Sequence, residues 1–270
     1  PIFQTMFNVH VDYKLSLLPT ATPYSRNAIF CGLFPDEMVK KYPEQARLMV
    51  EHSSSLNSLE PQFLEDQLKR LGLGDKSMHY HKIWAVEEGK KFQNRIPDYL
   101  QRDMLALVVN FVDMLAHRSS QTDVLKEIVQ DETGFRVAVK SWLEHSWLLQ
   151  VLKKLSESDF TVIITSDHGS IRVQKDVMVA ADREASTGVR YKYGRNLNTK
   201  DRNALIIHDP AQYRLPAFGP QPTYLIARDD VFFVYPNQVH KFLSKFKNSF
   251  QHGGISMEEM MVPVAVMKAR

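Results

Sequence analysis

The segment Phe160–Ile164 and the residues directly after it constrain the fold of this chain more than any other stretch. The segment is short, β-branched and almost wholly apolar, which is typical of a buried strand in a parallel sheet. Asp167 and His168 follow at once, and Gly169 lets the backbone turn there. Ligands of open α/β sheets bind at the carboxyl ends of strands, so this pair can present a carboxylate and an imidazole to one divalent cation. The alternative is that Asp167 caps the next segment and His168 is a polar loop residue.

A second apolar segment, Leu105–Val112, is also followed by an aspartate and a histidine. Asp113 and His117 are four residues apart, so on a helical turn both side chains lie on one face and can reach one ion. Taken alone, this pair has the alternative of a helix-capping Asp and a surface His. A helix predicted over Gly134–Ser156 separates the two strands, and a β–α–β connection of this kind predicts parallel strands with a right-handed crossover.

The N-terminal region supplies a hydroxyl group at the start of a helix. Tyr13–Leu18 is predicted as a strand that Pro19 ends. Thr22 is a good N-cap, Pro23 suits the first helical position, and Gly32 suits the C-terminal stop. A hydroxyl at this place lies where backbone N–H groups and the helix dipole favour a bound anion. The alternative is that Thr22 caps the helix and does nothing more.

Residues 36–100 read as a mainly helical insertion or cover. Two amphipathic helices are predicted, Asp36–His52 and Pro61–Leu71, both rich in Lys, Glu and Gln. Met78–Trp84 alternates as an edge strand does. Its two histidines share one face and could bind a metal, but with no third ligand nearby a solvated face is the preferred interpretation.

The C-terminal third contributes cations and one further histidine. Val189–Arg195 interleaves basic with aromatic residues, so Arg190 and Lys192 are candidates to hold a phosphate while a ring stacks on a base. A surface loop is the alternative for this segment. His252 stands beside two glycines before a short helix, in a loop that can approach an ion closely.

The remaining strands and helix of the C-terminal third follow from local patterns. Tyr224–Ala227 and Val231–Tyr235 are predicted to form a hairpin through the turn between them. Ala204–Ile207 and Val262–Met267 are further strands, and Pro236–Phe246 is a helix.

Length and composition favour one large α/β domain over residues 1–270, without internal repeats or linkers. Thirty-four basic residues stand against 31 acidic ones, and the net charge of +3 is too slight for wholesale nucleic-acid binding. The single cysteine, Cys31, excludes an internal disulfide and suits a reducing compartment. With no signal peptide and no apolar run of about 18 residues, we expect a cytoplasmic protein without membrane insertion. Because the chain opens at Pro1 without an initiator Met, we also expect it to be part of a longer protein.

Together these pieces resemble the alkaline phosphatase superfamily of two-metal hydrolases. In that family one ion is held by an early Asp, the nucleophile and an Asp-His pair that ends a strand, whereas the other is held by an Asp, a nearby His and a late His. The resemblance implies an α/β fold with a mostly parallel central sheet and helices on both faces. It carries the nucleophile and the ligands onto residues that stand in the family's order: Thr22, Asp113, His117, Asp167, His168 and His252.

The resemblance also implies the metals and the contacts to substrate. A mixed His/Asp ligand set suits two Zn²⁺ ions per chain, with Mn²⁺ as the alternative. Ser25 and Arg26 stand at the spacing that the sulfatase branch uses, and the run Thr22–Gly32 matches the spacing of the nucleotide phosphodiesterase branch. A phosphodiester, nucleotide or oligonucleotide, is therefore the expected substrate, and Arg26 is expected to bind a non-bridging oxygen.

Within the superfamily the segments 190–195 and 252–260 resemble the PglZ domain, and more narrowly the C-terminal effector domain of PorX-type response regulators, which are tied to type IX secretion. This likeness implies an upstream receiver domain. The family's first metal-binding Asp ends a strand well before the nucleophile, whereas Asp12 is only ten residues before Thr22 and precedes a strand. We therefore expect that Asp, and the core strand that carries it, upstream of Pro1.

The sequence thus predicts a two-zinc phosphodiesterase with a Thr nucleophile, acting as the output domain of a two-component response regulator. A homodimer and a signalling protein partner are expected with it. The alternative is a non-catalytic, metal-stabilised docking domain for a secretion or transcription partner. The hydroxyl of Thr22 argues against that alternative, because a purely structural metal site does not require it.

Overall fold

The computed structural model describes residues 1–45, 57–118, 122–180 and 188–270. The described chain divides into two compact units. Unit 1 comprises Pro1–Lys14, Leu68–Ser166 and Pro263–Arg270, and unit 2 comprises Leu15–Gln67 and Asp167–Val262. Within the described ranges, no helix is both long and apolar enough to cross a bilayer.

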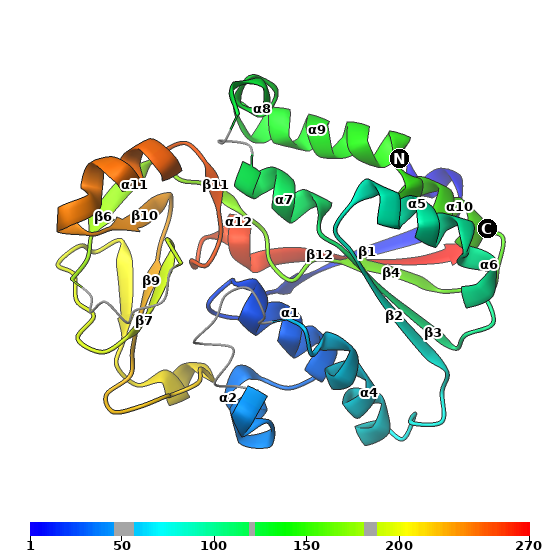
Figure 1. The fold of residues 1–270 in the computed structure, drawn as a ribbon, viewed down its shortest axis with the longest axis horizontal. Helices are drawn as coiled ribbons and strands as arrows, with labels where there is room; N and C mark the ends of the chain where they lie inside the picture. The colour runs from blue at the N-terminus through cyan, green and yellow to red at the C-terminus, as the bar shows by residue number, and fades with distance from the viewer. Residues whose placement is uncertain (46–56, 119–121, 181–187) are drawn as a thin grey trace. The chain divides into compact units, whose positions relative to one another are not determined.

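Unit 1 contains two small sheets (Figure 1). Three strands lie in the order β1 (Phe7–Leu15), β12 (Met261–Ala269) and β4 (Val162–Thr165), and β12 runs antiparallel to β4. The second sheet pairs β2 (Met78–Ile83) with β3 (Met104–Val109) in parallel. The strand predicted over 78–84 is confirmed as β2, which ends at Ile83 and, among the described residues, is paired along one edge.

In the described part of unit 1, one short helical turn precedes β1, two helices lie between β2 and β3, and four lie between β3 and β4. They are η1 (Phe3–Thr5), α5 (Val86–Asn94), α6 (Ile96–Tyr99), α7 (Phe111–Arg118), α8 (Asp123–Ile128), α9 (Glu132–His145) and α10 (Trp147–Leu155). The single helix predicted over 134–156 is interrupted at Ser146, whose extended backbone (φ −90°, ψ 160°) ends α9 and begins α10. The break lets α10 turn one apolar face onto the strands, with Trp147, Val151 and Leu155 buried in one cluster and Leu152 in another.

Unit 2 is built on short strands and helices. Its largest sheet has the order β7 (Tyr191–Gly194), β9 (Thr223–Ala227) and β8 (Ala204–Ile207), all antiparallel. β10 (Val231–Val234) pairs in parallel with β6 (Lys175–Met178), and β11 (Phe250–Gln251) pairs antiparallel with β5 (Ile171–Arg172). The helices are α1 (Thr22–Cys31), α2 (Pro35–Lys41), most of α4 (Glu60–Arg70), η2 (Pro210–Tyr213), η3 (Pro236–Gln238), α11 (Val239–Phe246) and α12 (Met257–Met260).

The sheets differ from the predicted architecture. The described strands form small sheets of mixed direction instead of one mostly parallel central sheet. β4, predicted as a buried parallel strand, pairs antiparallel with β12, and the side chain of Ile163 is 61% exposed. The prediction that 224–227 and 231–235 form a hairpin is wrong. Val231 and Phe233 pack toward β9, whereas Phe232 and Val234 face a different core, so β10 lies against β9 and hydrogen-bonds to β6.

Predictions of helix ends from local sequence agree with the structure better than the predictions of strand pairing do. The helix predicted from Thr22 is confirmed, and Gly32 ends it with φ 61°, a left-handed conformation that favours glycine. One detail is corrected: Ala21 is the N-cap, so Thr22 is the first helical residue. The helix predicted over 36–52 is present as α2 only as far as Lys41, because Tyr42 is the C-cap, so one continuous helix is wrong; the predicted end at His52 lies outside the described residues. The prediction of a single domain over 1–270 stays a prediction.

Candidate active site

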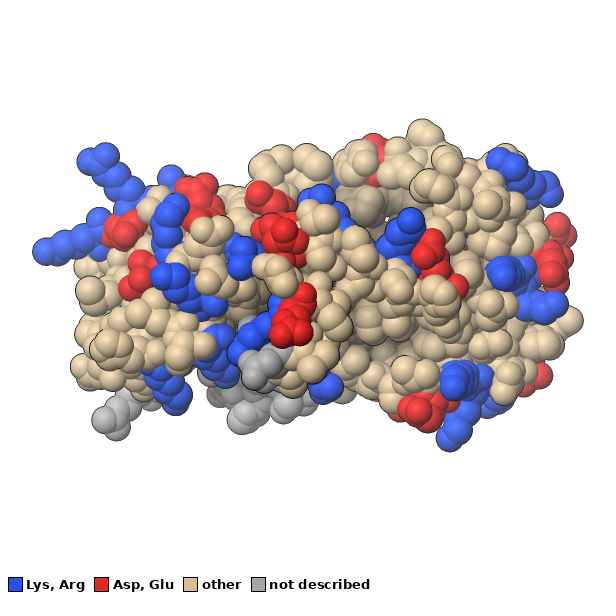
Figure 2. All heavy atoms as spheres, turned by 90° about the horizontal axis from the view of Figure 1, so that it is seen from above, with Lys and Arg blue, Asp and Glu red and all other residues tan. Residues whose placement is uncertain are grey.

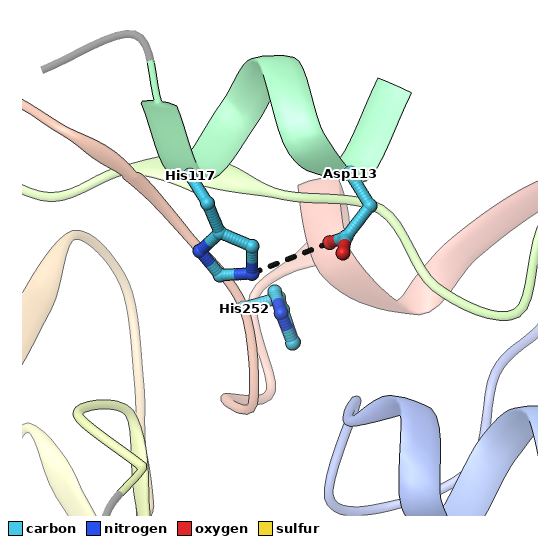
Figure 3. Close-up of side chains that lie close together, drawn as sticks. All are labelled: Asp113, His117 and His252. Atoms are coloured by element: carbon cyan, nitrogen blue, oxygen red, sulfur yellow. Dashed lines mark ion pairs between the residues drawn. The ribbon is translucent and has the colours of Figure 1, made fainter. Parts of the chain in front are cut away.

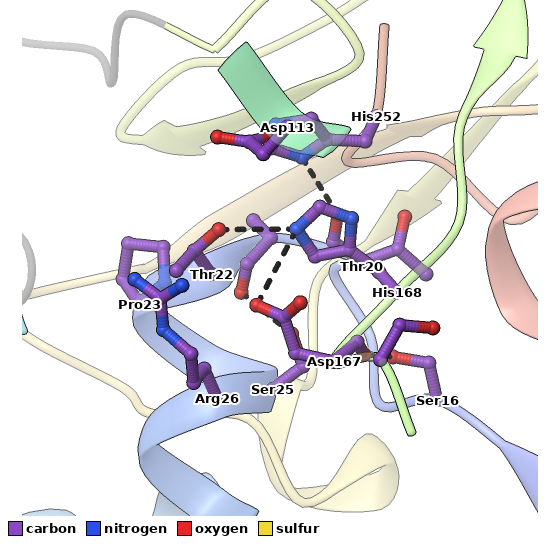
Figure 4. Close-up of polar contacts among 12 residues, drawn as sticks. Ser16, Thr20, Thr22, Pro23, Ser25, Arg26, Asp113, Asp167, His168 and His252 are labelled. Carbon is purple, nitrogen blue, oxygen red and sulfur yellow. Dashed lines mark hydrogen bonds and ion pairs between the residues drawn. The ribbon is translucent and has the colours of Figure 1, made fainter. Parts of the chain in front are cut away.

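Helix α1 places Thr22 at its N-terminus, where the backbone N–H groups lack helical partners. The helix is held by Tyr24, which is buried against Tyr193 and Tyr224 of the β7–β9–β8 sheet. Thr22 Oγ1 lies 3.0 Å from Nε2 of His168 (Figure 4). The hydroxyl predicted to be a nucleophile therefore faces one of the histidines predicted to bind metal, and both belong to unit 2.

The hydrogen bonds of His168 fix which ring nitrogen carries its proton. Nδ1 lies 2.9 Å from the carbonyl oxygen of Gly169. A carbonyl oxygen only accepts, so Nδ1 donates, and in the neutral imidazole Nε2 carries the lone pair. Nε2 then accepts from the hydroxyl of Thr22. The imidazole thus presents the atom that binds a cation toward Thr22.

Asp167 contributes a buried carboxylate oxygen to the same place. Its Oδ2 lies 3.6 Å from Nε2 of His168. This oxygen is buried, and no group in the described part of the chain hydrogen-bonds to it. A buried carboxylate oxygen that lacks a hydrogen bond costs several kcal/mol, which a bound cation would offset. Carboxylate and imidazole are a donor set for a divalent metal, so these two residues fit one.

His252 stacks on His168, with ring centroids 4.0 Å apart and planes inclined by 19°. Its Nδ1 lies 3.0 Å from the carbonyl oxygen of Thr20, so Nδ1 donates and Nε2 again carries the lone pair. The buried hydroxyl of Thr20 donates to Gly254 O and accepts from Gly253 N. Thr20 therefore fixes both the tautomer of His252 and the loop that carries it, a role that the sequence reasoning missed.

Arg26 lies one turn after Thr22 on α1, and Figure 4 shows its guanidinium on the same side of the helix. Its Nε donates to Glu60 Oε1 at 2.8 Å. The side chain of Glu60 is 0% exposed and that of Arg26 is 13% exposed. A fixed guanidinium beside the hydroxyl suits a phosphate or sulfate group. Glu60 was not among the predicted site residues, because 34 positions separate it from Arg26 and no local pattern links them.

The other residues predicted to contact substrate, Ser25, Arg190 and Lys192, are buried and contact other parts of the protein. Arg190 is fully buried and pairs through two nitrogens with Glu259, each at 2.7 Å. Lys192 is buried with its ammonium 4.7 Å from the ring centroid of Tyr235, and burial lowers the pKa of Lys192 to about 8. The hydroxyl of Ser25 is buried and donates to a backbone carbonyl one turn earlier. The prediction that Ser25, Arg190 and Lys192 bind substrate is therefore not supported by their positions.

Glu259 has a different importance, because it anchors the loop of His252. Besides the pair with Arg190, its carboxylate accepts from Gly254 N at 2.8 Å and from Ser256 Oγ at 2.8 Å. A Cβ on Gly254 would stand 2.4 Å from the guanidinium of Arg190, so no side chain fits there. The buried ion pair thus fixes the backbone beside His252. Gly254, Ser256 and Glu259, all within the segment 252–260 that resembles the PglZ domain, form this anchor.

Unit 1 carries the other predicted ligand pair on α7. Asp113 Oδ1 lies 3.3 Å from His117 Nε2 (Figure 3). The prediction that a helical turn brings these two side chains onto one face is confirmed. The hydrogen bond that His117 donates to the carboxylate of Asp113 raises the pKa of His117 above its ordinary value, although burial opposes the shift. The pair offers a carboxylate and an imidazole, the same donor chemistry as Asp167 and His168.

The family model described as the BREX system PglZ alkaline phosphatase-like domain matches residues 3–267. The match covers both units and includes every residue discussed above. No curated protein matches the chain.

Proposed function

Since the chain belongs to the PglZ family of alkaline phosphatase-like domains, we propose that it is a metal-dependent phosphoesterase with Thr22 as its nucleophile. The observation that carries the proposal is the contact of 3.0 Å between Thr22 Oγ1 and His168 Nε2, beside an unsatisfied buried oxygen of Asp167. A hydroxyl at a helix N-terminus, a guanidinium and a cation-binding pair are the parts that attack on a phosphate ester requires.

Zn²⁺ is the proposed metal, because the donor set mixes imidazoles with carboxylates, and Mn²⁺ is the alternative. Asp167 and His168 would hold one ion beside Thr22. Asp113 and His117, with His252 as their proposed third partner, would hold the other. The chemistry that such ions supply is a lowered pKa for a bound hydroxyl and stabilisation of charge on the phosphoryl oxygens.

The reaction proceeds in two displacements at phosphorus. Thr22 loses its hydroxyl proton to solvent as a bond forms between its Oγ1 and phosphorus, and the ester bond to the leaving alcohol breaks as that alcohol takes up a proton from solvent. Water then attacks the phosphoryl-threonine, the bond to Thr22 breaks, and phosphate or a phosphomonoester is released. Arg26, fixed by Glu60, holds non-bridging oxygens during both steps.

A phosphodiester is the proposed substrate class, nucleotide or oligonucleotide. The proposal rests on the resemblance of the run Thr22–Gly32 to the nucleotide phosphodiesterase branch. The segment 190–195 no longer supports it, because Arg190 and Lys192 are buried. Figure 2 shows Lys and Arg side chains among Asp and Glu side chains on the face in view. Because Arg190 and Lys192 are buried, recognition is proposed to occur at the site itself, through Arg26.

The cellular role is proposed on resemblance alone. We propose a cytoplasmic output domain of a response regulator, which receives its signal from a receiver domain in the same polypeptide and acts as a dimer toward a signalling partner. The alternative of a non-catalytic docking domain gains no support from the site, because such a domain needs neither the hydroxyl of Thr22 nor the guanidinium of Arg26.

The test is hydrolysis by the natural full-length protein, loaded with Zn²⁺ or Mn²⁺. Bis(4-nitrophenyl) phosphate, 4-nitrophenyl phosphate and 4-nitrophenyl sulfate represent the three ester classes. We expect the diester to be cleaved fastest and a chelator to abolish cleavage. Faster cleavage of the monoester or the sulfate would overturn the proposed substrate class. If the metal-loaded protein cleaved none of the three esters, the proposal that it is a phosphoesterase would be wrong.

A further inference from the structure

Strand β7 places two tyrosines on the face of its sheet that packs against helix α1. Tyr191 and Tyr193 are two positions apart, so their rings share one face, and both belong to the core that contains Ala21 and Tyr24. Ala21 is the N-cap of α1 and Thr22 is its first residue. The two rings therefore pack beside the helix end that carries the proposed nucleophile.

The ring of Tyr191 also contacts the loop of His252. It meets the ring of Tyr24 edge to face, with ring centroids 5.9 Å apart. A Cβ on Gly253 would lie 2.7 Å from the Tyr191 ring, and a Cβ on Gly188 would lie equally close. No side chain fits at either glycine unless the ring moves. The ring is thus held in contact with both the first turn of α1 and the residue that follows His252.

The hydroxyl of Tyr191 differs from those of the tyrosines around it. Tyr193 Oη donates to the carbonyl oxygen of Phe218 at 2.5 Å, and Tyr224 Oη donates to that of Pro216 at 2.9 Å. Within the described ranges, the hydroxyl of Tyr191 has no hydrogen-bond partner, and its oxygen is not wholly buried. Interior hydroxyls usually have a protein partner, so this accessible hydroxyl is available to a ligand.

The protonation state of this hydroxyl suits contact with an anion. Burial of the ring raises the pKa of Tyr191 to about 12, so the hydroxyl keeps its proton at neutral pH. A neutral O–H donates to an anionic oxygen, whereas a tyrosinate would repel it. Negative charge lies on the non-bridging oxygens during attack at phosphorus, and donors that are fixed beforehand stabilise it best.

We propose that the hydroxyl of Tyr191 donates a hydrogen bond to a phosphoryl oxygen of the substrate. This inference rests on the proposed function, because it takes the ester to be bound beside Thr22. All the contacts that place the ring lie within unit 2, together with Thr22 and His252. Arg26 would supply a charged donor and Tyr191 a neutral one. The segment 189–195 then serves the site through an aromatic residue instead of through its cations.

The first test compares Tyr191→Phe with the wild type in the natural full-length protein, loaded with Zn²⁺. The substitution removes the hydroxyl and keeps the ring, so the packing against α1 is retained. We expect kcat/KM for bis(4-nitrophenyl) phosphate to fall at least about tenfold, with unchanged metal content. Tyr213→Phe, at an exposed position, is the control and should match the wild type. Equal kcat/KM in Tyr191→Phe and the wild type would overturn the inference and leave the proposed function standing.

A second measurement does not depend on turnover. Inorganic phosphate, followed by isothermal titration calorimetry, should bind Tyr191→Phe about tenfold more weakly than it binds the wild type. If that difference is found in a protein that cleaves no ester, the donor assignment stands and the proposal of a phosphoesterase is wrong. Equal phosphate affinity would overturn the donor assignment, whatever the outcome of the hydrolysis assays.

Tyr193→Phe separates a contact with substrate from a structural role. Because the hydroxyl of Tyr193 is bonded to Phe218, its loss should lower the melting temperature and leave phosphate affinity unchanged. Tyr191→Phe should do the reverse, weakening phosphate binding at an unchanged melting temperature. If Tyr191→Phe lowers the melting temperature as much as Tyr193→Phe does, the hydroxyl of Tyr191 is structural and the inference is wrong.

Discussion

Thr22 Oγ1 and His168 Nε2 lie 3.0 Å apart. Which of the two atoms donates depends on the hydrogen bond that the other ring nitrogen, Nδ1, makes on the far side of the imidazole. Because His168 Nδ1 donates to the carbonyl oxygen of Gly169, the nitrogen that faces Thr22 accepts in the neutral imidazole. A hydroxyl is therefore matched to a lone pair, which either a proton or a cation can use. The Oδ2 atom of Asp167 beside them is buried and has no hydrogen-bond partner in the described part of the chain, which favours the cation.

The first prediction concerns Asp167→Asn, which removes the buried charge. In metal-free protein the variant should be at least as stable as the wild type, because an unpaired buried carboxylate is costly. With Zn²⁺ the order should reverse, since the wild type gains a ligand bond that the amide does not match. Thermal unfolding with and without Zn²⁺ measures both effects, and Asp176→Asn, at an exposed position on β6, is the control. A wild type that is more stable than the variant in a chelator would contradict the account.

The second prediction concerns Glu60, which positions Arg26. Glu60→Gln should raise KM for a phosphate ester by about tenfold, because a neutral partner holds the guanidinium less firmly. The same change should leave metal content unaltered. Asp98→Asn breaks the exposed pair with Arg95 and should change neither quantity. A loss of kcat at constant KM would argue that Glu60 acts in the chemical step and not in positioning.

The third prediction concerns the buried pair of Arg190 and Glu259. Glu259→Gln leaves the guanidinium without a counter-charge, and we expect a loss of about 3–5 kcal/mol in the free energy of unfolding. The exposed pair of Lys154 and Glu157 is the comparison, and Glu157→Gln should cost less than about 1 kcal/mol. Urea unfolding measures both. Equal effects of the two substitutions would show that the buried pair does not anchor the loop of His252.

The fourth prediction follows from the pKa of Lys192, which burial lowers from 10.5 to about 8. Between these pH values the unfolded chain binds a proton that the folded chain does not, so the free energy of unfolding rises with pH. Relative to Lys192→Met, the wild type should gain about 2 kcal/mol between pH 8 and pH 10. Lys247→Met, at an exposed site, should show no such pH dependence. A constant difference between wild type and Lys192→Met would mean that the ammonium is not buried.

What the sequence predicted well rests on signals between near neighbours. Asp113 and His117 share a helical face because four residues make about one turn. Gly32 ends α1 because the chain needs a left-handed residue there. Such signals do not depend on the rest of the fold.

What the sequence did not predict depends on residues far apart in the chain. Arg190 looked like a substrate contact in a basic-aromatic loop, but its partner Glu259 is 69 positions away. Val231 follows Ala227 closely enough to suggest a hairpin. The side chain of Val231 instead packs in the same core as Ala227, while the backbone of β10 hydrogen-bonds to β6 and not to β9. Glu60 gave no local signal at all.

The most direct test of the central claim separates turnover from metal binding at Thr22. Thr22→Ala in the natural full-length protein should keep most of its metal, measured by mass spectrometry, and lose at least about 1,000-fold in phosphodiester turnover. Thr22→Ser should recover part of that turnover, and Thr199→Ala should behave as the wild type does. Full turnover by Thr22→Ala at saturating metal would contradict the assignment of Thr22 as the nucleophile.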